Sequence, residues 1–193
     1  MTAWSERRYV VVDVEGNGHQ PPDLVELAVV TVERGVIGQP VVWLVRPDQP
    51  ISPMARRIHG ISNDMVASAP AFAELAIDVA AHLDQSVMVA HNAGVDLGVL
   101  QRKLPGFTPD AVIDTLRLAR RLLPDQPNHR LGSLATALGL GRDLPPGSRP
   151  HRAGYDALVT ARLFVYLAGS ASSSSLSFEA LRDGVGDGDA TLF

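Results

Sequence analysis

The chain has 193 residues, of which 46% are hydrophobic and 20% are charged, and its net charge at pH 7 is −4. This length suffices for one domain with a sizeable core. The absence of cysteine excludes disulfides and thiolate metal sites. Any metal is therefore expected on oxygen and imidazole ligands, which favours Mg²⁺ or Mn²⁺ over Zn²⁺. The acidic balance argues against a protein that coats long nucleic acid, but it leaves open an enzyme that grips a few nucleotides through metals.

Neither a membrane span nor a leader is expected from the sequence. No run of 18 or more apolar residues occurs, and the first eight residues do not resemble a signal peptide. We therefore expect a cytoplasmic protein with no membrane contact.

The first half of the chain is rich in β-branched residues. Residues 8–15 predict a buried strand. Two further β-rich runs, 24–33 and 36–46, are joined at Arg34-Gly35 and predict an antiparallel hairpin. A short helix is expected to end before His59, and residues 69–84 carry apolar side chains at helical spacing.

Strands and helices alternate in the second half. Short strands are predicted at 86–90 and 111–113, each followed by a helix, and two further helices are predicted at 131–140 and 153–168. The pattern predicts an α/β domain over residues 1–169. Its mixed central sheet would have about five strands, the first three antiparallel, with helices on both faces. Residues 170–193 are Ser/Gly-rich and are expected to form a C-terminal tail.

Acidic residues stand at the ends of these predicted elements. Asp13 and Glu15 close the first strand, and because strand side chains alternate, both project from the same face. Two adjacent carboxylates at the end of a buried strand are costly unless a cation neutralises them. Asp96 begins a helix after a strand, while Asp156 lies on the last long helix with His151 in the loop before it. Ligands gather where strands end and helices begin, so we expect all five side chains to converge.

Four carboxylates and a histidine suit two-metal phosphoryl chemistry. Two divalent ions about 3.5–4 Å apart can hold the attacking and leaving oxygens of an in-line displacement. One ion lowers the pKa of a bound water, and an imidazole that titrates near neutral pH can accept the proton. The sequence therefore predicts metal-dependent hydrolysis of a phosphodiester.

Three motifs in this order resemble the DEDDh 3′–5′ exonucleases, a family that includes the proofreading (epsilon) subunit of bacterial DNA polymerase III. The motifs are Asp13-Val14-Glu15, Val89-Ala90-His91-Asn92-Ala93-Gly94-Val95-Asp96 and His151-Arg152-Ala153-Gly154-Tyr155-Asp156-Ala157. Three shorter stretches, 58–61, 68–72 and 113–116, also look like the family, so the resemblance covers about residues 8–168. It implies a ribonuclease H-like fold and stepwise hydrolysis from a 3′ end that releases 5′-mononucleotides.

The resemblance also implies a role for each candidate residue. Asp13, Glu15, Asp96 and Asp156 would ligate two Mg²⁺ or Mn²⁺ ions, and His151 would be the general base. The residues implied to hold or border the terminal nucleotide are Gly16, Asn17, His59, Ile61 and Asn92. Gly16 and Asn17 stand where the family often has two threonines, so the grip on the substrate is expected to differ. Asp114 is expected to be a supporting partner of the site or a helix N-cap rather than a ligand.

Simpler interpretations stand beside these. Asp13 and Glu15 could form an exposed strand end, His91-Asn92 could be a turn after a strand, and His151 could be a surface loop histidine. His59 could belong to a loop that Ile58 and Ile61 anchor in the core.

Three functions compete. The first is an exonuclease acting on single-stranded DNA in proofreading or repair, and the second is an exoribonuclease of the same family that trims RNA ends or short oligonucleotides. The motifs separate these poorly, because the site would have to sense the 2′-hydroxyl. The third is an inactive nucleic-acid-binding module, against which the intact ligands and base argue.

The chain ends in a segment that suggests a partner. Leu192 and Phe193, after Asp189 and small residues, resemble the short peptides that dock into bacterial sliding clamps. A sliding clamp or a DNA polymerase is thus a possible partner. The alternatives are packing of this tail on the domain's own surface and plain disorder.

Overall fold

The fold is built on a six-stranded mixed sheet. The computed structural model describes residues 3–169 and 176–182. The strands follow the order β3-β2-β1-β5-β6, and β4 also pairs with β2. Their bounds are β1 Arg8–Gly16, β2 Leu24–Glu33, β3 Val36–Ile37, β4 Val41–Leu44, β5 Val87–Ala90 and β6 Ala111–Asp114. Strands β1 to β4 pair antiparallel, whereas β5 and β6 run parallel to β1, so the predicted mixed sheet is confirmed.

The sequence predicted one strand over residues 36–46, and this prediction was wrong. The segment forms two strands, β3 and β4, with a break at residues 38–40. At Gly38 the chain runs so close to Thr31 that an added Cβ would lie 2.6 Å from its hydroxyl oxygen. Pro40 follows and has no N–H to continue the ladder. The sheet therefore has six strands rather than about five.

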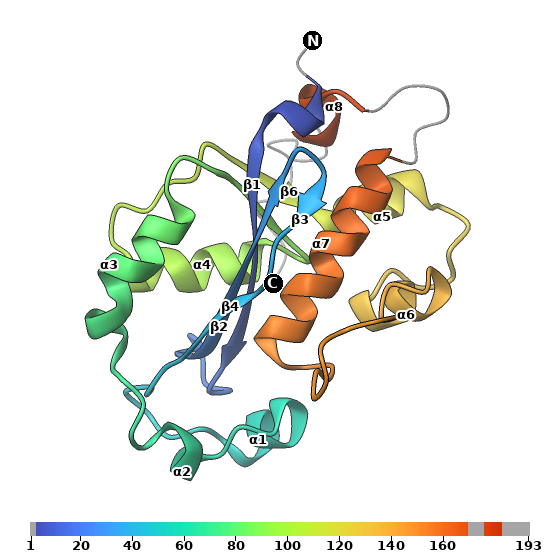
Figure 1. Cartoon of the computed structure of the whole chain (residues 1–193). Helices are drawn as coiled ribbons and strands as arrows, with labels where there is room; N and C mark the ends of the chain where they lie inside the picture. The colour runs from blue at the N-terminus through green and yellow to red at the C-terminus, as the bar shows by residue number, and fades with distance from the viewer. Residues whose placement is uncertain (1–2, 170–175, 183–193) are drawn as a thin grey trace.

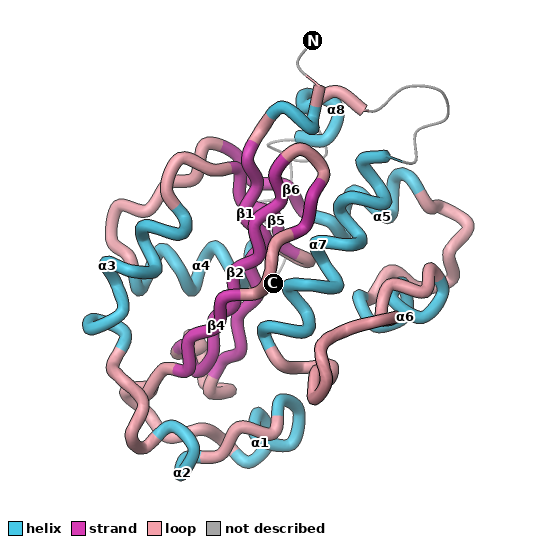
Figure 2. The backbone as a smooth tube through the Cα atoms, in the orientation of Figure 1, coloured by secondary structure: helices cyan, strands magenta, loops and turns pink. Residues whose placement is uncertain are grey.

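Helices cover both faces of the sheet (Figure 1). Helices α3 and α4 lie on one side, α5, α6 and α7 lie on the other, and the short helices α1 and α2 lie beyond one end of the strands (Figure 2). The helix bounds are α1 Pro53–His59, α2 Asn63–Val66, α3 Phe72–Leu83, α4 Gly94–Lys103, α5 Thr115–Leu122, α6 Leu131–Ala137, α7 Ala153–Gly169 and α8 Phe178–Arg182. A short 3-10 turn, Trp4–Glu6, precedes β1. The predicted helix over 131–140 ends early, because Gly139 has a φ of +66°.

Strand β1 is buried on both faces, which explains its unbroken hydrophobic run. Tyr9 and Val11 belong to the core under α7, and Val10 and Val12 belong to the core under α3 and α4. Alternation along the strand therefore places Asp13 and Glu15 on the face that α7 covers. The fold thus decides which helix meets these two acids.

Aromatic packing holds the C-terminal half of helix α7 against the start of the chain. Its Phe164 lies 4.7 Å from Tyr9 and 5.6 Å from Trp4, measured between ring centroids. Because the helix is held there, its first turn reaches the end of β1 that carries the acids.

Part of the segment expected as a tail packs on the domain. Ser177 forms a β-bridge with Ala3, and Phe178 and Leu181 of α8 are buried in the core under α7. The domain boundary at residue 169 stays a prediction. Leu192 and Phe193 lie outside the described residues. None of the helices described here has the length and apolar character that crossing a membrane requires.

Candidate active site

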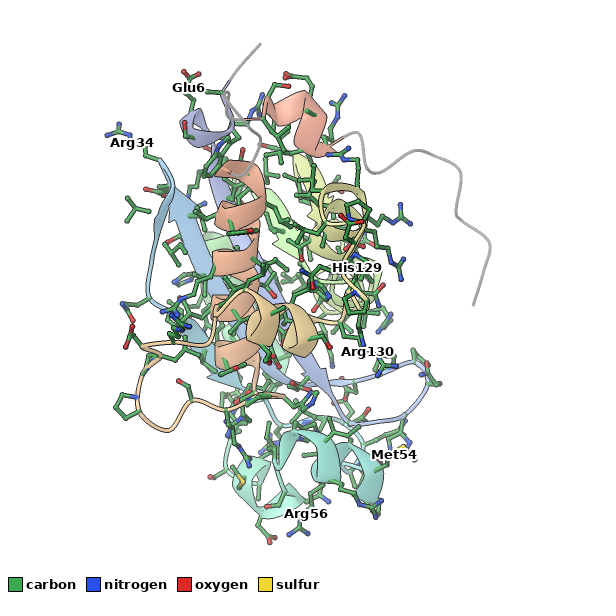
Figure 3. The ribbon with its side chains drawn as sticks, turned by 90° about the vertical axis from the view of Figure 1, so that its right-hand side faces the viewer. Glu6, Arg34, Met54, Arg56, His129 and Arg130 are labelled. Atoms are coloured by element: carbon green, nitrogen blue, oxygen red, sulfur yellow. The ribbon has the colours of Figure 1, made fainter. Side chains whose placement is uncertain are left out.

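Three carboxylates meet between the end of β1 and the first turn of α7. Oxygens of Asp13, Glu15 and Asp156 all lie within 4.8 Å of one another. They line a cavity of about 320 Å³, which His151 also lines. Arg130, just before α6, also lines this cavity (labelled in Figure 3). The simple interpretation of Asp13 and Glu15 as an exposed strand end therefore does not hold, since both face a shared cavity.

Asp96 adjoins this cluster and is itself buried. Its Oδ1 accepts a hydrogen bond from the Val14 N–H at 3.1 Å, so the carboxylate sits against the strand between Asp13 and Glu15. It does not belong to the group of three whose oxygens approach within 4.8 Å. The structure thus brings three of the four expected ligands together and places the fourth beside them.

Asp114 organises the junction that carries Asp96. Its carboxylate accepts from the N–H groups of Asn92 at 3.0 Å and Ala93 at 3.2 Å, and it also caps α5. Asn92 adopts a left-handed turn with a φ of +70°. Asp114 is therefore the N-cap that the sequence allowed, and Asn92 forms the turn that leads into α4.

His151 is held close to Asp156 by its backbone. Its N–H donates to Asp156 Oδ2 at 2.8 Å, while its side chain remains exposed. Its φ is +59°, a conformation that costs a non-glycine residue of order 1–3 kcal/mol. The surrounding structure must supply that energy, which indicates that the position of His151 is imposed.

Without a cation, the four carboxyl groups ionise less readily than usual, because they are buried close together. Burial, and then the charges of Asp96 and Asp156, raise the pKa of Asp13 well above its usual range. Burial and Asp156 raise the pKa of Glu15 to about 8. Burial likewise raises the pKa of Asp96 to about 7 and that of Asp156 to about 6, although the N–H of His151 partly offsets the latter. A set of hard oxygen donors that resists ionising together fits a divalent cation such as Mg²⁺ or Mn²⁺.

Sequence reasoning missed one acid beside the cluster. Glu26, on β2, is only 1% exposed and pairs in register with Glu15 on β1. Its carboxylate binds the Arg152 guanidinium and the Ala153 N–H at the start of α7. The available signal was a single acid inside the apolar run of residues 24–30, a position where an unpaired charge is costly.

His91 does more than form the turn after β5 that the sequence suggested. Its ring lies between the Thr115 hydroxyl and the His129 carbonyl, 3.0 Å from each, and burial lowers its pKa. The neutral ring ties β5 to the loop that carries Arg130. His91 therefore shapes the cavity wall in addition to forming a turn.

Asn17 does not present its amide to a substrate, contrary to expectation. The residue is fully buried, and its Oδ1 accepts from the N–H groups of Asp23 at 3.0 Å and His19 at 3.2 Å. Its Nδ2 donates to the Gln49 carbonyl at 3.4 Å. The amide stabilises the loop between β1 and β2, while Gly16 ends β1 directly after Glu15.

His59 and Ile61 are buried where α1 ends. Ile61 is fully buried, and its N–H donates to Nδ1 of His59, which is 2% exposed. Burial lowers the pKa of His59, and its carbonyl accepts from Arg149 at 3.1 Å. This burial favours the alternative of a loop held in the core over a contact of Ile61 with the terminal nucleotide. Ile58, however, is 53% exposed and does not anchor that loop.

The chain is similar to known nucleases. Residues 10–164 match the RNase T family model, described as "Exonuclease". A PolC-type DNA polymerase III of Bacillus cereus is 34% identical over 193 residues, covering 96% of this chain and 13% of the relative. Exodeoxyribonuclease 10 of Escherichia coli K12 is 39% identical over 155 residues, covering 80% of this chain and 66% of the relative. The structure of exonuclease X in complex with 5′ overhanging duplex DNA superposes with a TM-score of 0.75 at 37% identity, covering 92% of this chain and 99% of that chain.

The curated relatives are longer than this chain. It spans 18% and 13% of the first two relatives that it matches. The similarity therefore concerns one domain of those proteins.

Proposed function

Because the chain belongs to the DEDDh family of 3′–5′ exonucleases, we propose that it hydrolyses single-stranded DNA stepwise from a 3′ end and releases 5′-mononucleotides. The observation that carries the proposal is the convergence of Asp13, Glu15 and Asp156 within 4.8 Å. DNA is favoured over RNA because one similar protein is named an exodeoxyribonuclease and another is a DNA polymerase. Proofreading or repair is the process such an activity would serve.

Asp13, Glu15, Asp96 and Asp156 would hold two Mg²⁺ or Mn²⁺ ions, with Asp96 joining the other three from the start of α4. When bound, such ions neutralise the phosphodiester and activate a water. The carboxylates, whose pKa values are raised in their absence, supply the negative charge that the ions require.

His151 would accept the proton of the attacking water. His151 is an exposed residue that lines the cavity, and its backbone N–H is hydrogen-bonded to Asp156. An imidazole on the cavity that the three carboxylates line supports this role, because a general base must lie within reach of the proton that it accepts. Arg130 lines the same cavity and would offer its guanidinium to a phosphate.

The test compares oligomers of equal DNA and RNA sequence, labelled at either end, with Mn²⁺ present. The 3′-labelled DNA should release its label as a mononucleotide at once, whereas 5′-labelled DNA should give a ladder that shortens with time. RNA should be degraded more slowly. Release of the 5′ label first would refute the polarity, and faster degradation of RNA would favour the exoribonuclease alternative.

The tail would recruit a sliding clamp through Leu192 and Phe193. Two adjacent apolar side chains can fill a pocket on a partner. A peptide of residues 186–193 should bind a bacterial clamp in a fluorescence anisotropy assay, and the same peptide with Ala at both positions should not. Equal binding of the two peptides, or binding by neither, would exclude this role.

A further inference from the structure

Glu26 occupies an unusual place among the acids of the site. It pairs in register with Glu15 across β1 and β2, so its side chain lies on the same face of the sheet. It is nevertheless almost completely buried and does not belong to the group of three. Its negative charge raises the pKa values of both Asp13 and Glu15. A buried acid that opposes the ionisation of its neighbours needs a compensating role.

Within the part of the chain that the structure describes, the carboxylate of Glu26 is hydrogen-bonded to residues between His151 and Asp156. Arg152 Nε donates to Oε1 at 3.1 Å and to Oε2 at 3.0 Å, and Nη2 also donates to Oε1. The Ala153 N–H donates to Oε2 at 2.8 Å. Ala153 is the first residue of α7, so Glu26 also satisfies one of the N–H groups that a helix start leaves free.

This pair has two physical consequences. The bidentate contact fixes both the position and the direction of the chain at Arg152, directly after the strained backbone of His151. The pair also engages the guanidinium of Arg152, which lowers the pKa of Glu15. Without Glu26, this guanidinium would be free to pair with Glu15. A guanidinium on Glu15 would compete with metal ions for that carboxylate.

We propose that Glu26 is a positioning residue: it holds the start of α7 on β2, so that His151 and Asp156 face Asp13 and Glu15, and it keeps Arg152 away from Glu15. The inference rests on the proposed function for its effect on turnover, but its effect on metal binding stands independently. Glu26 touches neither substrate nor the reacting atoms in this scheme.

The test uses Glu26→Gln in the full chain, with Glu33→Gln as the matched control. Glu33 lies on the same strand and pairs with Arg8 at 3.2 Å, but that pair is exposed and distant from the cavity. Mn²⁺ affinity is measured by calorimetry, kcat and KM with a DNA oligomer, and the unfolding midpoint by heating. For Glu26→Gln we expect Mn²⁺ affinity to fall about 10–100-fold, as for partners of metal ligands, with a comparable loss in kcat and little change in KM. Glu33→Gln should change none of these values.

Arg152→Gln provides a second route if Glu26→Gln folds poorly, because Arg152 is only half-buried. Arg152→Gln removes the pair without releasing a cation toward Glu15, so Mn²⁺ affinity should fall, but by less than in Glu26→Gln. The double variant should resemble Arg152→Gln, since neither retains a guanidinium that could turn to Glu15. A fall in the unfolding midpoint with unchanged Mn²⁺ affinity and kcat would overturn the inference and leave a purely structural pair. If the unaltered protein bound Mn²⁺ but degraded no DNA, the proposed function would fail while the Mn²⁺ measurements still decided the role of Glu26.

Discussion

The acids of the cavity should make the metal-free protein less stable than it would be with neutral side chains. Glu15 is the best test, because burial and its neighbours Asp156, Glu26 and Asp96 all raise its pKa. The change Glu15→Gln keeps the shape of the side chain and removes the charge. We expect this variant to unfold at a higher temperature than the unaltered protein in EDTA, although it should lose its exonuclease activity.

The pH dependence follows from the direction of the shift. The pKa of Glu15 is about 8 in the folded protein and 4.5 ordinarily. A carboxyl whose pKa is raised by folding favours the folded state below pH 4.5, and this contribution is lost as the pH rises through 8. The difference corresponds to about 5 kcal/mol at 1.36 kcal/mol per pKa unit. Solvent in the cavity screens part of this energy. We therefore expect Glu15→Gln to raise the free energy of unfolding by about 2–3 kcal/mol at pH 9. For a chain of this size, that corresponds to a rise of roughly 4–12 °C in the unfolding midpoint.

The assay is thermal unfolding in EDTA at pH 5, 7 and 9. The rise in unfolding midpoint caused by Glu15→Gln should be near zero at pH 5, and it should be larger at pH 7 and larger still at pH 9. Glu33→Gln, which removes an exposed acid from the neighbouring strand, should show no such growth. A variant that is less stable than the unaltered protein at pH 9, or a gain independent of pH, would refute the electrostatic reasoning.

Three other outcomes are expected. His151→Ala should lower kcat by about 10²–10⁴-fold while Mn²⁺ affinity and KM stay nearly constant in steady-state kinetics and calorimetry; unchanged kcat would remove His151 from the mechanism. EDTA should abolish DNA hydrolysis and Mg²⁺ or Mn²⁺ should restore it, whereas Ca²⁺ should raise the unfolding midpoint with little turnover because its coordination is longer and looser; full hydrolysis in EDTA would exclude a metal mechanism. Arg130→Ala should raise KM by roughly tenfold, as expected when a charge-assisted phosphate contact of about 1.5 kcal/mol is lost. The control Arg120→Ala, on the exposed face of α5, should leave KM unchanged. If the KM of Arg130→Ala equalled that of the unaltered protein, Arg130 would not contact the substrate.

The sequence by itself determined most helices and strands and the acids of the three motifs, although not Glu26. The uninterrupted β-branched run within residues 8–15 predicted a buried strand, and the structure confirms it as β1. Alternation then fixed Asp13 and Glu15 on one side of it. These inferences succeeded because side-chain periodicity and turn chemistry are local properties of the chain.

Tertiary structure alone decided which groups share an environment. Nothing in the sequence distinguished Ile61, which is buried, from Ile58, which is exposed, since both are isoleucines three residues apart. The sequence suggested that Asn17 could hold a nucleotide, but in the folded domain its amide is hydrogen-bonded within the loop between β1 and β2.

The pairing of Glu26 with Arg152 spans 126 positions of the chain, and no local pattern encodes such a contact. It exists because β2 lies beside β1 and α7 crosses both strands. Burial, charge pairing and raised pKa values depend on the distance between groups in space, and that distance is set only when the whole domain has packed.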